Sequence, residues 1–354
     1  MRPLAEVFPL LGWLKHYQRQ TFISDLVAGI IVAILLIPQG MAYAILAGLP
    51  PQYGLYASIL PLFIYSLLGS SRSLAVGPVA IASLMVSTSI SQLAPQSEAD
   101  YINAAINLSL LVGVILLVLR CIRLGAIVNF ISHSVLTGFT SAAAIIIALS
   151  QVKHLLGLDL ARAERIDESL MAIASNLPNT NSITAVISVI AFIILWYCKR
   201  TLCDQLLRLK LPQGVVEPIC KAGPMFALLI GSIAVWYFSF DQTAAVKTVG
   251  MIPQGLPHLH ALHIDVDLWR QLMMPALLIA LIGFLESVSV GTALASKRQE
   301  RINPNKELVA LGMANIGSAL SGTYPVAGGF GRSMVNYSAG AQTTIASMIS
   351  AILV

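Results

Sequence analysis

The sequence predicts an all-α polytopic membrane protein made of two inverted repeats. Three observations favour this fold class: a low charge content, long apolar runs without any charge, and helix-breaking segments in corresponding places of the two halves. Charged residues make up 10% of the 354 residues and hydrophobic residues 57%, whereas a soluble protein carries about 25% charged residues. The chain therefore has too few charges to cover two soluble domains.

The longest segments without Asp, Glu, Lys or Arg are Leu26–Ser71, Leu124–Val152 and Ser169–Cys198. A membrane helix needs about 20 apolar residues, so each segment can hold one or two spans. Apolar runs between turn signals predict ten spans and part of an eleventh. They are Asp25–Leu46, Leu55–Leu68, Gly77–Leu93, Ala105–Leu119, Ala126–Leu149, Ile183–Cys198, Ala222–Phe238, Leu272–Ala295, Leu308–Gly322, Gly331–Gly340 and a last span from about Gln342 onward.

The distribution of Lys and Arg predicts the orientation of these spans. With the N-terminus in the cytoplasm, fifteen of the 21 Lys and Arg residues fall in cytoplasmic segments, five in outside segments, and Arg332 within the membrane. The same orientation places all four cysteines near the cytoplasm, where thiols stay reduced. Residues 1–24 are predicted to form an amphipathic cytoplasmic segment on the surface of an inner (plasma) membrane.

Several other classes of function are disfavoured. The net charge is +5, but no segment combines dense Lys and Arg with aromatic residues, so no nucleic-acid partner is expected. The cysteines have no CxxC spacing, and His258, His260 and His263 have no acid or cysteine that completes a metal site. No nucleophile–base pair indicates an enzyme, and neither a metal nor a cofactor is expected.

The helix-breaking segments give the two halves a common design. In the first half, Pro38-Gln39-Gly40 is expected to interrupt the first span, and the short third span starts at Gly77-Pro78 as a half-helix would. In the second half, the eighth span carries Glu286 and the tenth starts after Tyr324–Gly331. By the predicted orientation the third span runs outward and the tenth inward. This is the arrangement of inverted-repeat transporters, whose substrate binds near the midplane.

Electrostatics predict an anion as the substrate. Two half-helix N-termini would meet at mid-membrane, each with unpaired N–H groups and about half a positive charge. Arg332 adds a full positive charge with a guanidinium that suits oxyanions. Burying it there costs about 2.5–3.5 kcal/mol, which argues for a functional role. The alternative is a structural arginine that pairs with a carbonyl or with Glu286.

The roles of three further residues are open between function and structure. Glu286 can neutralise Arg332 in the empty state or bind a coupling ion, H⁺ or Na⁺, and these roles are compatible. Gln39 and Tyr43 lie four residues apart and share one helix face. They can line the site or hold neighbouring helices together.

Several motifs resemble the sulfate permease (SulP) family. Residues 51–72, which begin Pro51-Gln52-Tyr53-Gly54, match the family's signature of 22 residues without a mismatch. Ile37–Ala44, Val76–Pro78 and Ile131–Phe139 are also similar to that family. The resemblance extends from about Pro9 to the last residue.

The resemblance implies fourteen helices in two inverted seven-helix repeats, divided into a core and a gate domain, with an anion site between the third and tenth helices. The repeats would be residues 25–238 and an incomplete second repeat, 272–354. Many relatives have serine where this sequence has Gly331, so anion preference cannot be transferred. On matching positions, the substrate-binding residues would be Gln39, Tyr43, Val79, Gly331, Arg332 and Ser333.

The family pattern continues past Val354 with three more helices and a STAS domain, which serve gate structure, dimer contacts and regulation. The sequence is therefore expected to be a fragment or an incomplete gene product, with a possible homodimer in the full-length protein.

Together these features predict a secondary active transporter of small inorganic anions. Sulfate is the first candidate, with bicarbonate or a dicarboxylate as alternatives, carried in symport with H⁺ or Na⁺ by elevator-like or rocking movement of the core. Two other functions stay open on the same fold. One is a transport-inactive scaffold or sensor, and the other is a nucleobase permease, against which Arg332 and the matched signature argue.

Overall fold

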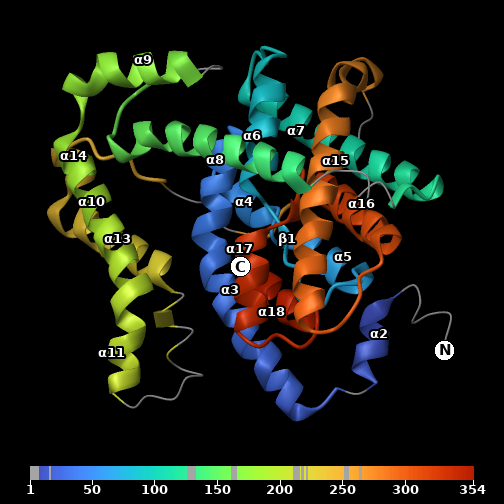
Figure 1. Cartoon of the computed structure of the whole chain (residues 1–354). Helices are drawn as coiled ribbons and strands as arrows, with labels where there is room; N and C mark the ends of the chain where they lie inside the picture. The colour runs from blue at the N-terminus through green and yellow to red at the C-terminus, as the bar shows by residue number, and fades with distance from the viewer. Residues whose placement is uncertain are drawn as a thin grey trace. The chain divides into compact units, whose positions relative to one another are not determined.

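The computed structural model describes residues 8–15, 17–125, 133–160, 166–209, 216, 219–220, 222–250, 255–262 and 265–354. The chain divides into two compact units, one of residues 1–131 and 253–354 and one of residues 132–252. Figure 1 shows the helices of both units along the chain. The units do not follow the predicted repeats, because the predicted first repeat, 25–238, contributes to both. The assignment of the repeats stays a prediction.

The first unit combines the beginning and the end of the described chain. Its N-terminal elements are α2 (Pro9–Leu14), α3 (Arg19–Ala47), α4 (Gln52–Tyr56), α5 (Leu60–Leu68), β1 (Val76–Gly77), α6 (Ala80–Ser91) and α7 (Glu98–Cys121). Its C-terminal elements are α15 (Val266–Lys297), α16 (Pro304–Leu320), β2 (Ala327–Gly328), α17 (Phe330–Ser338) and α18 (Ile345–Leu353). Each predicted span of this unit has a helix, although the second is divided into α4 and α5. In Figure 1, α18 at the red end of the chain lies beside the blue α3, with which it packs.

The second unit is described in less of its length. It contains α8 (His133–Leu155), α9 (Ile166–Asn176), η2 (Leu177–Asn179), α10 (Ser182–Tyr197), η3 (Cys198–Leu202), α11 (Cys203–Arg208), α13 (Gly223–Phe238) and α14 (Phe240–Thr243). Within it α10 packs against α13. Cys203 and Cys220 form a disulfide, so the prediction of four reduced thiols is wrong for this pair. The start of the predicted fifth span, 126–132, and five of the counted cations lie outside the described residues: Arg2, Arg162, Arg165, Lys210 and Lys221.

Within the described residues, length and composition make four helical segments suitable for crossing a membrane: Arg19–Ala47, Glu98–Cys121, Ser182–Arg208 and Val266–Lys297. Shorter apolar helices include Gln52–Leu68, Ala80–Ser91 and Gly223–Phe238. The predicted third span corresponds to α6, which has 12 residues. A helix of this length is about 18 Å long, which is too short for the roughly 30 Å of a hydrocarbon core. The third span is therefore a half-helix, as predicted.

Pro38 lies inside α3, which continues without a break for 29 residues. The prediction that Pro38-Gln39-Gly40 interrupts this span is therefore wrong. Proline removes one backbone donor and leaves the carbonyl four residues earlier, that of Ile34, without its helical partner. The other hydrogen bonds and the packing of α3 against neighbouring helices keep the helix intact around that defect.

Two glycines allow α3 and α4 to approach closely. A Cβ atom added to Gly54 would lie 1.9 Å from the carbonyl oxygen of Gly40, and one added to Gly40 would lie 3.0 Å from that of Gly54. A side chain therefore does not fit at Gly54, which this α3–α4 contact requires to be glycine, whereas at Gly40 the contact would be tight.

Gly54→Ala is expected to push α4 away from α3 and to destabilise the protein by at least about 1–3 kcal/mol, the usual cost of overpacking. Thermal unfolding in detergent measures the loss. Gly231→Ala in α13 is the matched control, because its added Cβ would meet only a methyl group of Ile187 at 3.8 Å. An unfolding temperature equal to that of the control would show that the two helices separate without cost.

A buried carboxylate joins the two halves of the first unit. Glu307, in the first turn of α16, is fully buried. It accepts hydrogen bonds from the hydroxyl of Tyr65 at 2.8 Å and from the backbone N–H and hydroxyl of Ser70 at 2.8 and 2.7 Å. These bonds fasten α5 and the loop after it to α16, which satisfies the buried charge.

The strands β1 and β2 pair in antiparallel fashion, with Val76 opposite Gly328 and Gly77 opposite Ala327. Because the strands run in opposite directions, the chain enters α6 and α17 from opposite sides, as inverted repeats require. The pairing also explains why α6 begins at Ala80 rather than at the predicted Gly77, since Gly77 still belongs to the strand. The two half-helices thus start next to one short ribbon.

Candidate functional site

The starts of α6 and α17 form the centre of the candidate site. Their N-cap residues are Val79 and Gly329, and neither provides a side-chain hydrogen bond to its helix. The first N–H groups of a helix have no partner within the helix. Two sets of backbone donors, together with the positive ends of two helix dipoles, are therefore present beside the β1–β2 ribbon.

Arg332, in the first turn of α17, lies against the opposite half-helix. Its side chain is 3% exposed, and its Nη2 donates a hydrogen bond to the carbonyl oxygen of Pro78 at 2.7 Å. A Cβ atom added to Gly77 would lie 2.9 Å from Nη1, so the guanidinium rests on the backbone of residues 77–78. Nη1 is buried and has no hydrogen-bond partner. Nη2 therefore makes the carbonyl contact that a purely structural arginine would make, whereas Nη1 is available to a ligand.

Gln39 and Tyr43 come from the C-terminal third of α3, which packs against both α6 and α17. The amide of Gln39 donates to the hydroxyl of Tyr43 at 2.9 Å, and both side chains are partly buried. Tyr43 also lies close enough to Arg332 for an electrostatic interaction. The structure thus places Tyr43 near the arginine, with Gln39 bonded to it, and the contact of both residues with a substrate stays a prediction.

Glu286 comes from α15, which packs against α6, α17 and β2. No ion pair joins Glu286 to Arg332, although the two charges interact at longer range. Its Oε2 is buried without a partner. The next residue, Ser287, accepts a hydrogen bond from the N–H of Gly328 at 2.8 Å, which fastens α15 to β2. Glu286 is therefore held beside the ribbon with one oxygen free to take a proton or a cation.

The other three predicted site residues have different surroundings. Val79 is 4% exposed, and its side chain packs near Gly329. Gly331 is exposed, and a Cβ atom added there would meet no atom within 4 Å. The hydroxyl of Ser333 is already used, because it donates to the carbonyl of Gly329 at 2.6 Å and accepts from the N–H of Ala75 at 3.0 Å. Ser333 thus fastens α17 to the residues before β1.

Sequence reasoning missed the hydroxyl of Tyr324 near the arginine and that of Ser83 beside it. Tyr324 and Ser83 are fully buried, and their hydroxyls lie near each other. Tyr324 also lies near enough to Arg332 for an electrostatic interaction. Tyr324 stands in the predicted break before α17, which was a usable signal, whereas nothing in the sequence distinguishes Ser83 from the other three serines of α6.

The histidines show no metal site in the part of the chain that the structure describes. No group of three His, Cys, Asp or Glu residues is placed to hold an ion there. The backbone N–H of His260 donates to the carbonyl of Leu320 at 2.9 Å, which anchors the loop before α15. His263 lies outside the described residues.

Comparison with known proteins gives consistent matches. The model of the sulfate permease family matches residues 22–354. The chain is 38% identical over 349 residues to sulfate transporter 4.1, chloroplastic, of Arabidopsis thaliana, covering 98% of this chain and 49% of the relative. It is 34% identical over 367 residues to solute carrier family 26 member 6 of Homo sapiens, covering 99% and 47%. The chain thus spans about half the length of the curated relatives it matches.

Two solved structures have the same fold. The structure of SLC26A9 superposes with a TM-score of 0.90 at 25% identity, covering 99% of this chain and 56% of that one. The transmembrane domain of the cyanobacterium bicarbonate transporter BicA superposes with a TM-score of 0.79 at 21% identity, covering 95% and 82%. The fold is therefore an all-α polytopic membrane fold of the inverted-repeat kind. The family is one of permeases, and these relatives are named as transporters or carriers rather than enzymes, as the sequence predicted. Because the family model extends over nearly the whole chain, the protein belongs to the sulfate permease family.

Proposed function

We propose that the protein is a secondary active transporter of small inorganic anions, with sulfate as the first candidate substrate. The observation that carries the proposal is the buried Nη1 of Arg332, which has no partner and lies between the starts of two half-helices. A cation would be repelled by this arrangement, whereas an oxyanion could accept hydrogen bonds from Nη1 and from the backbone N–H groups.

The relatives support the class of substrate. One is named as a sulfate transporter, one as a solute carrier of family 26, and one structural neighbour as a bicarbonate transporter. Sulfate has four oxygens that can accept hydrogen bonds from Arg332 and both half-helices at once. Bicarbonate has fewer oxygens that can accept hydrogen bonds, and dicarboxylates are larger molecules. Both are therefore the second candidates.

Glu286 is the proposed coupling residue, in symport with H⁺ or Na⁺. Its free Oε2 and its position near Arg332 support this role. When Glu286 is ionised it competes with the anion for the guanidinium, and a bound proton or sodium ion removes that competition. Binding of the coupling ion and of the anion therefore favour each other, which is the thermodynamic requirement of symport.

The remaining assignments are part of the same proposal. The protein lies in an inner (plasma) membrane with a cytoplasmic N-terminus, and the full-length protein forms a homodimer. Its movement is the elevator-like or rocking motion that the family resemblance implies, with residues 25–238 and 272–354 as inverted repeats. The cation bias of the predicted loops supports the orientation.

Uptake of radiolabelled sulfate by proteoliposomes containing the full-length protein tests the proposal. Competition by unlabelled sulfate and bicarbonate, but not by uracil, is the expected result. Uptake inhibited by uracil alone would instead identify a nucleobase permease. Sulfate binding without uptake would support the scaffold or sensor alternative and would contradict transport.

Gly331→Val is expected to reduce sulfate uptake at least about tenfold relative to uptake of a smaller anion such as chloride, because branched methyl groups would occupy the open space at the start of α17. Gly331→Ser, which adds one small polar group there, is expected to be tolerated. The ratio of sulfate to chloride uptake measures the effect. Equal ratios for the valine variant and the wild type would show that the backbone at this position does not approach the substrate.

A further inference from the structure

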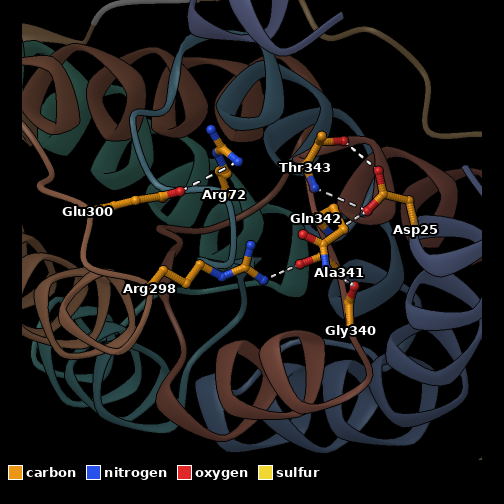
Figure 2. Close-up of polar contacts among 8 residues, drawn as sticks. All are labelled: Asp25, Arg72, Arg298, Glu300, Gly340, Ala341, Gln342 and Thr343. Carbon is orange, nitrogen blue, oxygen red and sulfur yellow. Dashed lines mark hydrogen bonds and ion pairs between the residues drawn. The ribbon is translucent and has the colours of Figure 1, made fainter. Parts of the chain in front are cut away.

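A second polar cluster lies at the other end of α17. Asp25, in the first turns of α3, is fully buried and accepts hydrogen bonds from the backbone N–H groups of Gln342 and Thr343, at 2.6 and 3.0 Å. Its other oxygen accepts from the hydroxyl of Thr343 at 2.5 Å and from that of Tyr17 at 3.1 Å. Figure 2 shows the carboxylate directed at the turn between α17 and α18. One aspartate thus anchors this turn to α3.

A glycine turn ends α17 just before these contacts. Gly340 has a φ of 91°, the left-handed conformation that favours glycine. Its N–H bonds to the carbonyl of Tyr337, and the N–H of Ala341 bonds to that of Asn336. This pair of bonds is a Schellman motif, which ends a helix at a fixed residue. The position of the turn therefore sets the position of the C-terminal end of α17.

A cation from α15 holds the same turn from the other side. Arg298 follows the last residue of α15, and its Nη2 donates a hydrogen bond to the carbonyl of Ala341 (Figure 2). Its guanidinium also lies over the ring of Tyr337 in α17, 5.2 Å from the ring centre. The charges match the helix dipoles, because Arg298 lies at the C-terminal end of α17 and Asp25 at the N-terminal side of α18.

Neighbouring charges do not replace these contacts. Glu300 and Asp25 both interact electrostatically with Arg298, but Glu300 forms its ion pair with Arg72, at 3.4 Å. Arg72 in turn lies 5.4 Å from the centre of the ring of Trp13 in α2. Asp25 and Arg298 are therefore the charged groups that contact the turn itself in the described part of the chain.

We infer that Asp25 and Arg298 are positioning residues for the anion site. The inference rests on the proposed function, because the site that they position is the one at Arg332. A helix of nine residues is about 13 Å long, so the turn lies one short rigid element away from the guanidinium. The start of α17 is held by Ser333 and the β ribbon, and its end by the Asp25–Arg298 clamp. Both attachments set how Arg332 faces Gln39 and Tyr43.

The experiment compares variants of the full-length protein in two measurements. The first is sulfate uptake by proteoliposomes, which gives the maximal rate and the sulfate concentration at half of that rate. The second is hydrogen–deuterium exchange of the backbone amides of α17. Asp25→Ala removes every contact of Asp25 to the turn and keeps that of Arg298. Asp25→Asn keeps an acceptor for the two N–H groups, and Thr343→Val removes only the hydroxyl, so these variants test the inference if the alanine variant fails to fold.

Asp265→Ala is the matched control. Asp265 also accepts two backbone N–H bonds, from Asp267 and Leu268, but it caps the outer start of α15 and is exposed. An effect of losing any helix cap would therefore also appear in Asp265→Ala. An effect of losing the contacts between Asp25 and the turn would appear only in the Asp25 variants.

Asp25→Ala is expected to raise the half-saturating sulfate concentration about tenfold, since a displacement near 1 Å of a binding group can cost up to about 100-fold. The maximal rate should change less, and the amides of α17 should exchange faster. Asp25→Asn and Thr343→Val should give smaller changes in the same direction, and Asp265→Ala none at α17. Faster exchange with unchanged half-saturation would overturn the inference, because the clamp would then stabilise the fold without positioning the site.

The two proposals can fail separately. In one case the wild type takes up sulfate, Arg332→Ala abolishes this uptake, and Asp25→Ala leaves it unchanged. The proposed function then stands, and the positioning role of the clamp is rejected. A wild type without any sulfate uptake rejects the function and, with it, the anion site that the clamp is inferred to position.

Discussion

Arg332→Ala is expected to abolish measurable sulfate binding by the full-length protein while leaving it inserted in the membrane. The variant loses the full positive charge and the free Nη1. It also loses the bond to the carbonyl of Pro78, which holds the guanidinium in place. Removing a buried charged donor from an anion costs at least about 3 kcal/mol, or about 100-fold in affinity. Calorimetry with sulfate and with bicarbonate measures the loss.

Two further variants make this result interpretable. Arg332→Lys keeps the charge but not the planar fork, so it should retain part of the affinity. Arg270→Ala removes an exposed arginine of α15 whose partner is the nearby Asp267, at 3.3 Å, and it should bind sulfate like the wild type. Unchanged affinity in Arg332→Ala would remove this residue from the site and with it the main argument for an anion substrate.

Glu286→Gln is expected to separate anion binding from coupling. The substitution keeps the shape of the side chain and removes its charge, so it resembles the protonated state. If Glu286 carries the coupling proton, the variant should bind sulfate about as well as the wild type at low pH. Its uptake should no longer respond to a proton gradient, and exchange of sulfate across the membrane should be the activity that remains.

A sodium-coupled mechanism gives a different result for the same variant. Sodium should then stop stimulating uptake, with less effect on the pH dependence. Uptake with and without each ion gradient, in proteoliposomes of controlled internal composition, measures both cases. A variant that still concentrates sulfate with the driving ion of the wild type would limit Glu286 to a structural partner of Arg332.

Local features of the sequence predicted much of the fold. Apolar runs and turn residues located the helices of the first unit, with starts missed by up to seven residues where polar residues open a helix, as at α7. Gly77-Pro78 and the glycines before Arg332 located both half-helices. Inverted orientation followed from the Lys and Arg distribution, and the antiparallel pairing of β1 and β2 agrees with it.

Other features depend on contacts that leave no local pattern. Asp25 and Glu307 are fully buried carboxyl groups near the ends of predicted spans, and nothing in the neighbouring sequence indicates their burial. Their partners, Thr343 and Ser70, stand more than 200 positions away. The continuity of α3 through Pro38 was missed for a related reason. A proline predicts a local defect, but the packing of neighbouring helices decides whether the helix breaks.

The ribbon of β1 and β2 has a consequence for biogenesis. Val76 and Gly328 are about 250 residues apart in the chain, and a ribosome adds about 5–20 residues per second, so β1 is synthesised roughly 10–50 s before its partner strand exists. During that time its backbone N–H and C=O groups have no strand to pair with, and such groups cannot face lipid without a large penalty. Until β2 is made, the β1 segment must therefore stay hydrated or be shielded from lipid by the insertion machinery. The centre of the site closes only after β2 has been inserted.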